Sequence, residues 1–454
     1  MLGLGLTSYL PIVVYLIVWA VFLLSIFWKH ELGLYLLVIL LPQTSGLHKM
    51  SAYFLGNHVL EILILGIFLG LLLRGQTIIQ RTTFGRIFFA LALVSYLSMW
   101  VGSLLTGAEY PLLPRDRMAH WIMFQRLPVI FYLVLATVRD RRQMAVLLLC
   151  MAFSYLMLSR GTRGAVAGRD ISFYRQNLRV EGALGQPNML GAMMAQCAAY
   201  CLGFFGVARG KALKVLVFAA FLVGCVVVMF TYSRGAYVAL AAGVLYLTML
   251  RMPYLLLLLI PMGAAWQVWL PGAVAERISM TYDDQGELEG SSAKRFELWN
   301  FAWNLIKSQP VLGVGFDTFR YFRADEELQD THNLYIRVQV ETGILGLAVL
   351  GWLFLKSYLT GFRLYRKGKD PFLRAIGLGF SAYMVALVMA NMFGDRWTYI
   401  ALSGYTFTLL ALTVRAQEME NGEAVAAVPQ ETAPPFAPGI QTGFVGGRSA
   451  NLPR

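Results

Sequence analysis

The sequence predicts an all-α protein, a polytopic bundle of transmembrane helices. Hydrophobic side chains make up 58% of the 454 residues and charged side chains only 14%, well below the share in soluble domains. Mean hydropathy is +0.60, and apolar runs of about 20 residues, enough to cross a bilayer, recur along the chain. The basic residues behind the net charge of +13 cluster in short segments between these runs. That distribution indicates cytoplasmic loops, so we expect membrane lipids as surroundings and no nucleic-acid partner.

The apolar runs give about 12 or 13 spans. The candidate ranges are 8–28, 32–44, 52–73, 85–105, 120–138, 143–158, 187–207, 213–231, 235–250, 253–270, 333–355, 371–393 and 397–414. If the spans alternate, all basic clusters share one face, and the loops 43–51, 105–119, 159–186, 231–234 and 271–331 share the other. The range 32–44 is short and contains Pro42. Twelve spans, with the N-terminus on the basic face, is therefore the alternative.

Two long polar segments complete this organisation. A transmembrane domain, 1–414, contains the large hydrophilic loop 271–331, in which we expect short helices. The tail 415–454 is rich in Ala, Pro and Gly and cannot bury enough apolar surface to order itself. We expect it to be disordered on the cytoplasmic side. The four cysteines lie in apolar runs without metal-ligand spacing, which predicts core thiols. We expect no metal site and no cofactor.

One of the five histidines, His332, stands where the large loop enters an apolar run. Thr331 or Asp330 is expected to cap the helix, which would put His332 in its first turn. The positive end of a helix dipole disfavours imidazolium, so the ring is expected to be neutral and able to accept a proton. A structural histidine is the alternative for this residue taken alone. Glu341, further along the same run, is expected to pair with Arg337 or another arginine.

Arginines gather in the loops on the same predicted face. The loop 159–186 carries five of them: Arg160, Arg163, Arg169, Arg175 and Arg179. A guanidinium forms bidentate hydrogen bonds with phosphate oxygens and stays charged at any pH. We therefore interpret the five arginines together as a site for an anionic ligand. For each arginine singly, anchoring to lipid headgroups or a cytoplasmic position of the loop is the alternative.

Arg234 is more specific, because it stands in a very short turn between two apolar runs, where charge is costly and usually functional. Snorkelling to headgroups is the alternative. Within the large loop, 293–308 predicts an amphipathic helix containing Arg295, which lies on the membrane surface or caps the bundle. Gly313 and Gly315 follow and permit close backbone approach.

These residues resemble the bacterial O-antigen ligase and O-antigen polymerase superfamily of membrane glycosyltransferases. The resemblance covers roughly 179–350. It is carried by Arg179 with Gly185-Gln186-Pro187-Asn188, by Ser233-Arg234-Gly235, by Arg295 and Trp299, by Pro310-Val311-Leu312-Gly313-Val314-Gly315, and by His332-Asn333 with Glu341-Thr342-Gly343-Ile344-Leu345-Gly346.

The resemblance implies a metal-independent enzyme of the inner membrane, active on its periplasmic face. Such an enzyme transfers a glycan from an undecaprenyl-diphosphate carrier to a sugar hydroxyl. The hydroxyl belongs to lipid A–core in a ligase and to another repeat unit in a polymerase. Carried over to this chain, His332 is the general base and Arg234 binds the diphosphate. The remaining predicted substrate-binding residues are Arg179, Arg295, Asn188, Asn333 and Arg163. A single displacement would invert the anomeric centre.

Two alternatives stay open at this point. A polymerase would use the same motifs as a ligase. Of the two, we favour the ligase. A lipid-linked glycan transporter would also bind diphosphate through arginines, but it should show repeated halves and helices broken near the midplane. The sequence shows no convincing repeat, and its charged groups gather on one predicted face, so an enzyme is favoured. The sequence leaves the oligomeric state open.

Overall fold

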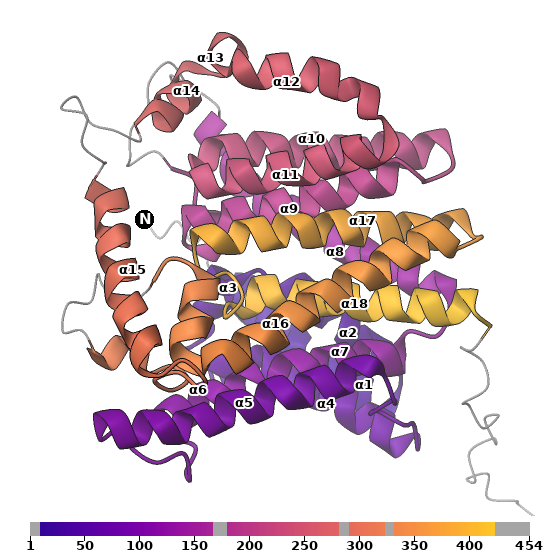
Figure 1. The fold of residues 1–454 in the computed structure, drawn as a ribbon. Helices are drawn as coiled ribbons and strands as arrows, with labels where there is room; N and C mark the ends of the chain where they lie inside the picture. Colours follow the sequence, from indigo (N-terminus) through magenta and orange to yellow (C-terminus); the bar gives the residue numbers. More distant parts are fainter. Residues whose placement is uncertain (1–9, 167–178, 281–289, 323–330, 423–454) are drawn as a thin grey trace, which may run out of the picture.

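The computed structural model describes residues 10–166, 179–280, 290–322 and 331–422, and these ranges are helical without any strand (Figure 1). The predicted all-α class is confirmed. In the first half of the chain the helices are α1 (Leu10–Phe27), α2 (His30–Leu40), α3 (Thr44–His48), η2 (Gly56–His58), α4 (Val59–Leu73), α5 (Thr83–Thr106), α6 (Asp116–Phe124), α7 (Arg126–Thr137), α8 (Arg141–Val166), η4 (Gly182–Leu184), α9 (Pro187–Phe205) and α10 (Lys211–Thr231). In the second half they are α11 (Arg234–Arg251), η5 (Pro253–Leu255), α12 (Leu256–Ala264), α13 (Trp266–Trp269), α14 (Gly272–Ser279), α15 (Gly290–Ser308), η6 (Phe319–Phe322), α16 (Leu334–Lys367), α17 (Pro371–Ala390), η8 (Asn391–Phe393) and α18 (Ile400–Glu420).

Within the described ranges, nine helical stretches are long and apolar enough to cross a membrane. The other predicted spans correspond to α2, α11, α12 and α18. Of these, α2 has 11 residues, about 16 Å at 1.5 Å per residue, which is shorter than a bilayer core. α11 and α18 have 18 and 21 residues and therefore have the required length. The chain is a polytopic helical membrane protein.

The predicted outer loops do meet at one end of the bundle, which we call the His332 end. Two hydrogen bonds connect loops that are far apart in sequence: the Thr44 hydroxyl donates to the Ala183 carbonyl (3.0 Å), and Arg117 donates to the Thr318 hydroxyl (3.2 Å). Within the large loop, the Trp299 indole donates to the carbonyl of Thr331 (2.8 Å). Alternation of the spans therefore predicted the arrangement of these loops correctly.

The predicted basic loops meet at the opposite end, which we call the basic end. Arg141 forms an ion pair with Asp370 (2.6 Å), and Arg251 donates to the Gly206 carbonyl (3.0 Å). The start of the chain is fixed here as well, because Arg74 donates to the carbonyl of Trp28 (2.6 Å). α1 thus ends at the basic end and begins at the His332 end, as the thirteen-span interpretation requires.

The long helix α16 is broken at Gly343, whose φ and ψ are 66° and −167°. Its short N-terminal part turns away from its long C-terminal part, which crosses the bundle obliquely (Figure 1). A continuous span over 333–355 was the prediction, and the break corrects it. The helix also continues to Lys367, beyond the predicted end.

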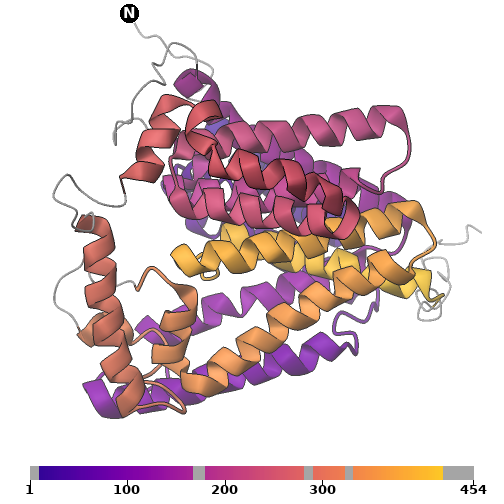
Figure 2. The same cartoon turned by 45° about the horizontal axis from the view of Figure 1, so that its top comes forward.

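α15 runs across the His332 end, roughly perpendicular to the long helices (Figure 2). It buries Leu298 and Ala302 against Val314, Phe319 and Val340. The predicted helix 293–308 therefore exists and caps the bundle. Another face of the same helix leaves Phe296 and Trp303 largely exposed.

Four further elements differ from the predictions. α8 continues to Val166, so Arg160 and Arg163 lie on a helix and not in a loop. The predicted spans 120–138 and 253–270 are each divided, the first into α6 and α7, the second into η5, α12 and α13. α18 continues to Glu420 and buries Arg415, so the beginning of the predicted disordered tail is helical. The rest of that tail lies outside the described residues.

Candidate functional site

His332 precedes the first turn of α16 and is not part of it. The cap is Asn333, whose side-chain oxygen accepts from the backbone N–H groups of Tyr335 (3.0 Å) and Ile336 (3.3 Å). The prediction that Thr331 or Asp330 caps the helix, with His332 in its first turn, is therefore wrong. Thr331 instead donates its hydroxyl to the Asn333 carbonyl (2.9 Å), and Asp330 lies outside the described residues.

The backbone at His332 is left-handed, with φ +51°. That backbone conformation is uncommon for residues other than glycine and costs of order 1–3 kcal/mol, so the surroundings must impose it. Two groups do so: Asn333 starts the helix on one side, and Trp299 of α15 holds the Thr331 carbonyl on the other. Thr331 is fully buried, whereas His332 is half-buried. His332 is thus half-buried and follows a buried, hydrogen-bonded support.

Arg179 joins two of the predicted motifs. Its Nη2 donates to Oδ1 of Asn188 (2.6 Å) and its Nε to the carbonyl of Thr231 (2.9 Å). Asn188 lies in the first turn of α9, which begins with Pro187. Thr231 is the last residue of α10. The predicted substrate-binding pair of Arg179 and Asn188 is therefore in contact, beside the turn that leads to Arg234.

Arg234 is the first residue of α11, after the short turn Tyr232-Ser233. Its Nη1 lies 3.4 Å from the Met280 carbonyl, so the side chain extends toward the residues that follow α14. The guanidinium is half-buried and is attached to the positive end of a helix dipole. A cation at this position does not stabilise the helix, which is consistent with a role outside helix formation.

The turn between α17 and α18, 391–399, connects the His332 segment with the arginine segments. A Cβ on Gly235 would lie 2.5 Å from Cβ of Phe393, so the turn packs on the start of α11. Arg396 Nη1 lies 3.3 Å from the Met189 sulfur, next to Asn188. On the other side, Asp395 forms an ion pair with Arg337 of α16 (2.7 Å).

Sequence reasoning missed Asp395 and Arg396. The signal was present, because Gly394-Asp395-Arg396-Trp397 places two charges in a short polar stretch between apolar runs. The same signal singled out Arg234.

Arg337 is surrounded by three carboxylates. Besides Asp395, it contacts Glu341 (3.3 Å) and Asp317 (3.4 Å), and the predicted pairing of Glu341 with Arg337 is thereby confirmed. Asp317 in turn contacts His120 (2.6 Å) and Arg320 (3.0 Å). The network ties α6, the segment before η6 and the α17–α18 turn to the first turns of α16. Its acidic surroundings make Arg337 a positioning group and a poor ligand for a diphosphate.

The glycine-containing segment 310–315 of the large loop forms backbone hydrogen bonds with the α16 segment around Gly343. The Val314 N–H donates to the Val340 carbonyl (2.8 Å) and the Gly315 N–H to the carbonyl of Glu341 (3.0 Å). In return the Ile344 N–H donates to the Pro310 carbonyl (2.9 Å). The segment 310–315 thus fills the break in α16, and its glycines allow the close backbone approach that the sequence predicted.

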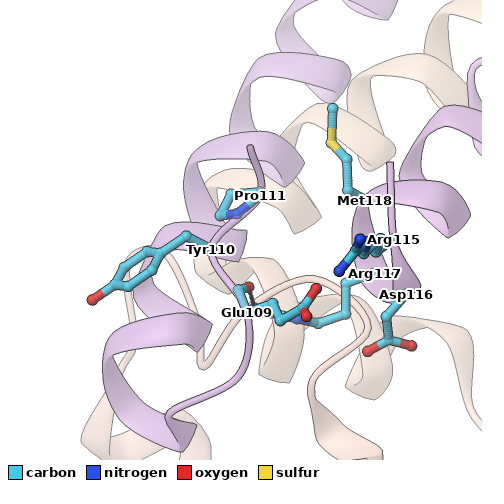
Figure 3. A pocket seen from close by; sticks show the side chains of 7 residues that line it. All are labelled: Glu109, Tyr110, Pro111, Arg115, Asp116, Arg117 and Met118. Carbon is cyan, nitrogen blue, oxygen red and sulfur yellow. Dashed lines mark hydrogen bonds between the residues drawn. The ribbon is translucent and has the colours of Figure 1, made fainter. Parts of the chain in front are cut away.

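Two cavities lie at this end. A groove of about 540 Å³ between α15 and α16 has an apolar lining that includes Trp299, Trp303 and Tyr335, with Asn300 and Gln339 as its polar members. The second, between Glu109–Pro111 and the start of α6 (Figure 3), measures about 10 Å³. It has room for a single water molecule, which excludes it as a sugar site.

Arg295 lies half-buried on α15, the helix that also carries Trp299. Arg163 lies on the last turns of α8, but its side chain is outside the described part of the chain, as are Arg169 and Arg175. Among the described residues, no group of three or more His, Cys, Asp or Glu side chains is arranged to hold a metal ion.

The O-antigen ligase family model matches residues 218–351. This range contains Arg234, Arg295 and His332, whereas Arg179 and Asn188 precede it. A comparison with curated proteins found no match. The resemblance to the O-antigen ligase superfamily is therefore confirmed over 218–351.

Proposed function

We propose that this protein transfers a glycan from an undecaprenyl-diphosphate-linked donor to a sugar hydroxyl, as a ligase acting on lipid A–core at the periplasmic face of the inner membrane. His332 is the general base. Arg234 binds the diphosphate, assisted by Arg179 and Arg295.

The observation that carries the proposal is the α17–α18 turn, which connects the segment of His332 to the segments of Arg179 and Arg234. The reaction requires two opposed functions, a base at the acceptor hydroxyl and cations at the departing diphosphate. The turn holds α16 through Asp395 and contacts the starts of both α9 and α11. A donor bound at these helix starts would therefore lie at the same end of the bundle as His332.

The chemistry is a single displacement. The neutral imidazole of His332 takes the proton of the acceptor hydroxyl, and the hydroxyl oxygen forms a bond to the anomeric carbon. The bond from that carbon to the diphosphate oxygen breaks at the same time, and the guanidinium groups stabilise the charge that develops on the diphosphate. The anomeric centre is inverted. His332 stands just before the positive end of the α16 dipole, which favours the neutral ring that this step requires.

Asn333, the helix cap, has a positioning role in this scheme. Its side-chain oxygen accepts hydrogen bonds from the first backbone N–H groups of α16. Asn333 is thereby fixed and orients His332, the residue before it. Asn188 is a positioning residue in the same sense, since it holds Arg179.

The test is glycan transfer in reconstituted membranes with an undecaprenyl-diphosphate donor, candidate acceptors and EDTA. We expect His332→Ala and Arg234→Ala to abolish transfer, with donor binding retained in His332→Ala. Arg366→Gln, an exposed arginine at the basic end, is the control. Normal transfer by both site variants would refute the assignment, and loss of transfer in EDTA would refute metal independence. Transfer to another repeat unit would identify a polymerase. Movement of the donor across the bilayer without any transfer would identify a transporter.

A further inference from the structure

The position of Arg396 extends the donor site beyond the residues assigned above. Arg396 lies in the α17–α18 turn, far from Arg179 and Arg234 in sequence and outside the range of the family match. Arg396 is half-buried, and two close contacts hold its side chain in place. Nη1 approaches the Met189 sulfur at 3.3 Å, and a Cβ on Gly394 would lie 2.6 Å from Nη2.

Three segments at the His332 end pack on one another in a closed set of contacts. The start of α9 packs on the turn before α11, because a Cβ on Gly191 would lie 2.8 Å from the hydroxyl of Thr231. The start of α11 packs on the α17–α18 turn at Phe393. The α17–α18 turn returns to the start of α9 through the contact of Arg396 with Met189.

Each of these segments carries or binds one arginine. Arg179 is bound to the start of α9, Arg234 opens α11, and Arg396 belongs to the α17–α18 turn. The N-termini of α9 and α11 add their own positive ends at the same place. We propose that Arg396 is a third guanidinium of the diphosphate site, and that it binds the leaving diphosphate together with Arg179 and Arg234. This inference rests on the proposed function.

The support of the turn favours a binding role. The Asn391 side chain accepts from the Arg396 backbone N–H (3.0 Å), and the buried Trp397 ring packs on Phe354 at a centroid distance of 5.0 Å. Asp395 anchors the same turn to Arg337. Neighbours on both sides therefore hold the backbone, so that the guanidinium is positioned before a ligand arrives, which is the arrangement that a tight anion site requires.

The experiment measures binding of undecaprenyl diphosphate and of undecaprenyl monophosphate to the full-length protein in phosphatidylcholine nanodiscs. We expect Arg396→Gln to weaken diphosphate binding about 10- to 100-fold, the usual range for one lost charge-assisted hydrogen-bonding group. Monophosphate binding should change less than about 3-fold, because a site built from three guanidinium groups has more of them than one phosphate can engage. Arg396→Lys should recover part of the loss as a point charge. Arg366→Gln is the control and should bind both lipids as the wild type does.

A parallel measurement with Arg234→Gln separates the two proposals. If Arg234→Gln binds diphosphate weakly while Arg396→Gln binds it normally, the role of Arg396 is refuted and the proposed function stands. If both variants bind it normally, the proposed diphosphate site is refuted as well. Equal loss of both lipids in Arg396→Gln, without recovery in Arg396→Lys, would show a structural role and overturn the inference.

Discussion

Replacing Gly343 with alanine should separate the large loop from α16. The backbone at Gly343, φ 66° and ψ −167°, lies in a region that only glycine adopts readily, and a side chain there costs of order 1–3 kcal/mol. A Cβ would also lie 2.6 Å from the Leu312 nitrogen and closer still to the Val311 carbonyl. Overpacking of this kind adds about 1–3 kcal/mol. The variant should therefore lose about 2–6 kcal/mol of stability at this junction.

The matched control is Gly351→Ala on the same helix. No atom lies within 4 Å of a Cβ at Gly351, and alanine is the better helix former by about 1 kcal/mol. Two measurements on the purified variants in detergent test this prediction. The first is the temperature of thermal unfolding, and the second is the rate at which a protease cleaves the large loop in the folded protein. We expect earlier unfolding and faster loop cleavage in Gly343→Ala alone. Equal stability of the two variants would refute the reasoning that segment 310–315 fills the break in α16.

Two further substitutions test the support of the site. Trp299→Phe removes the hydrogen bond to the Thr331 carbonyl but keeps an aromatic ring. We expect the free energy of unfolding to fall by about 1 kcal/mol and kcat for transfer to decrease, with donor affinity unchanged. An unchanged kcat would contradict a positioning role for α15. Asp395→Asn keeps the size of the side chain but removes one of the three carboxylates around Arg337. We expect a loss of about 1.5–3 kcal/mol in chemical unfolding. A loss below about 1 kcal/mol, typical of exposed ion pairs, would contradict the packing of this turn.

Much of the architecture followed from local properties of the chain. Apolar runs identified the helices, because in a bilayer the backbone must satisfy its hydrogen bonds within a segment. Alternation of the spans assigned the loops to two ends. Contacts such as Arg141 with Asp370 and Thr44 with Ala183 confirm the assignment. The pairing of Glu341 with Arg337 was also predictable, since the residues lie one helical turn apart.

The site was predictable only in part. Arg179, Asn188 and the turn before Arg234 meet as the shared motifs suggested. The cap at Asn333 was missed, because Thr, Asp and Asn are all good caps and the preceding backbone decides which of them starts the helix. Arg396 was missed because its neighbour Met189 is remote in sequence.

The sequence by itself determined the membrane class, the order of the helices and the end of the bundle at which the polar groups lie. These properties depend on the hydropathy and charge of contiguous residues, which the printed chain contains. Only the tertiary structure decided that α16 breaks at Gly343, that segment 310–315 enters the break, and that the α17–α18 turn joins His332 to the arginines. Each of these features depends on a contact between segments separated by many residues, and the geometry of such a contact is set by packing in three dimensions.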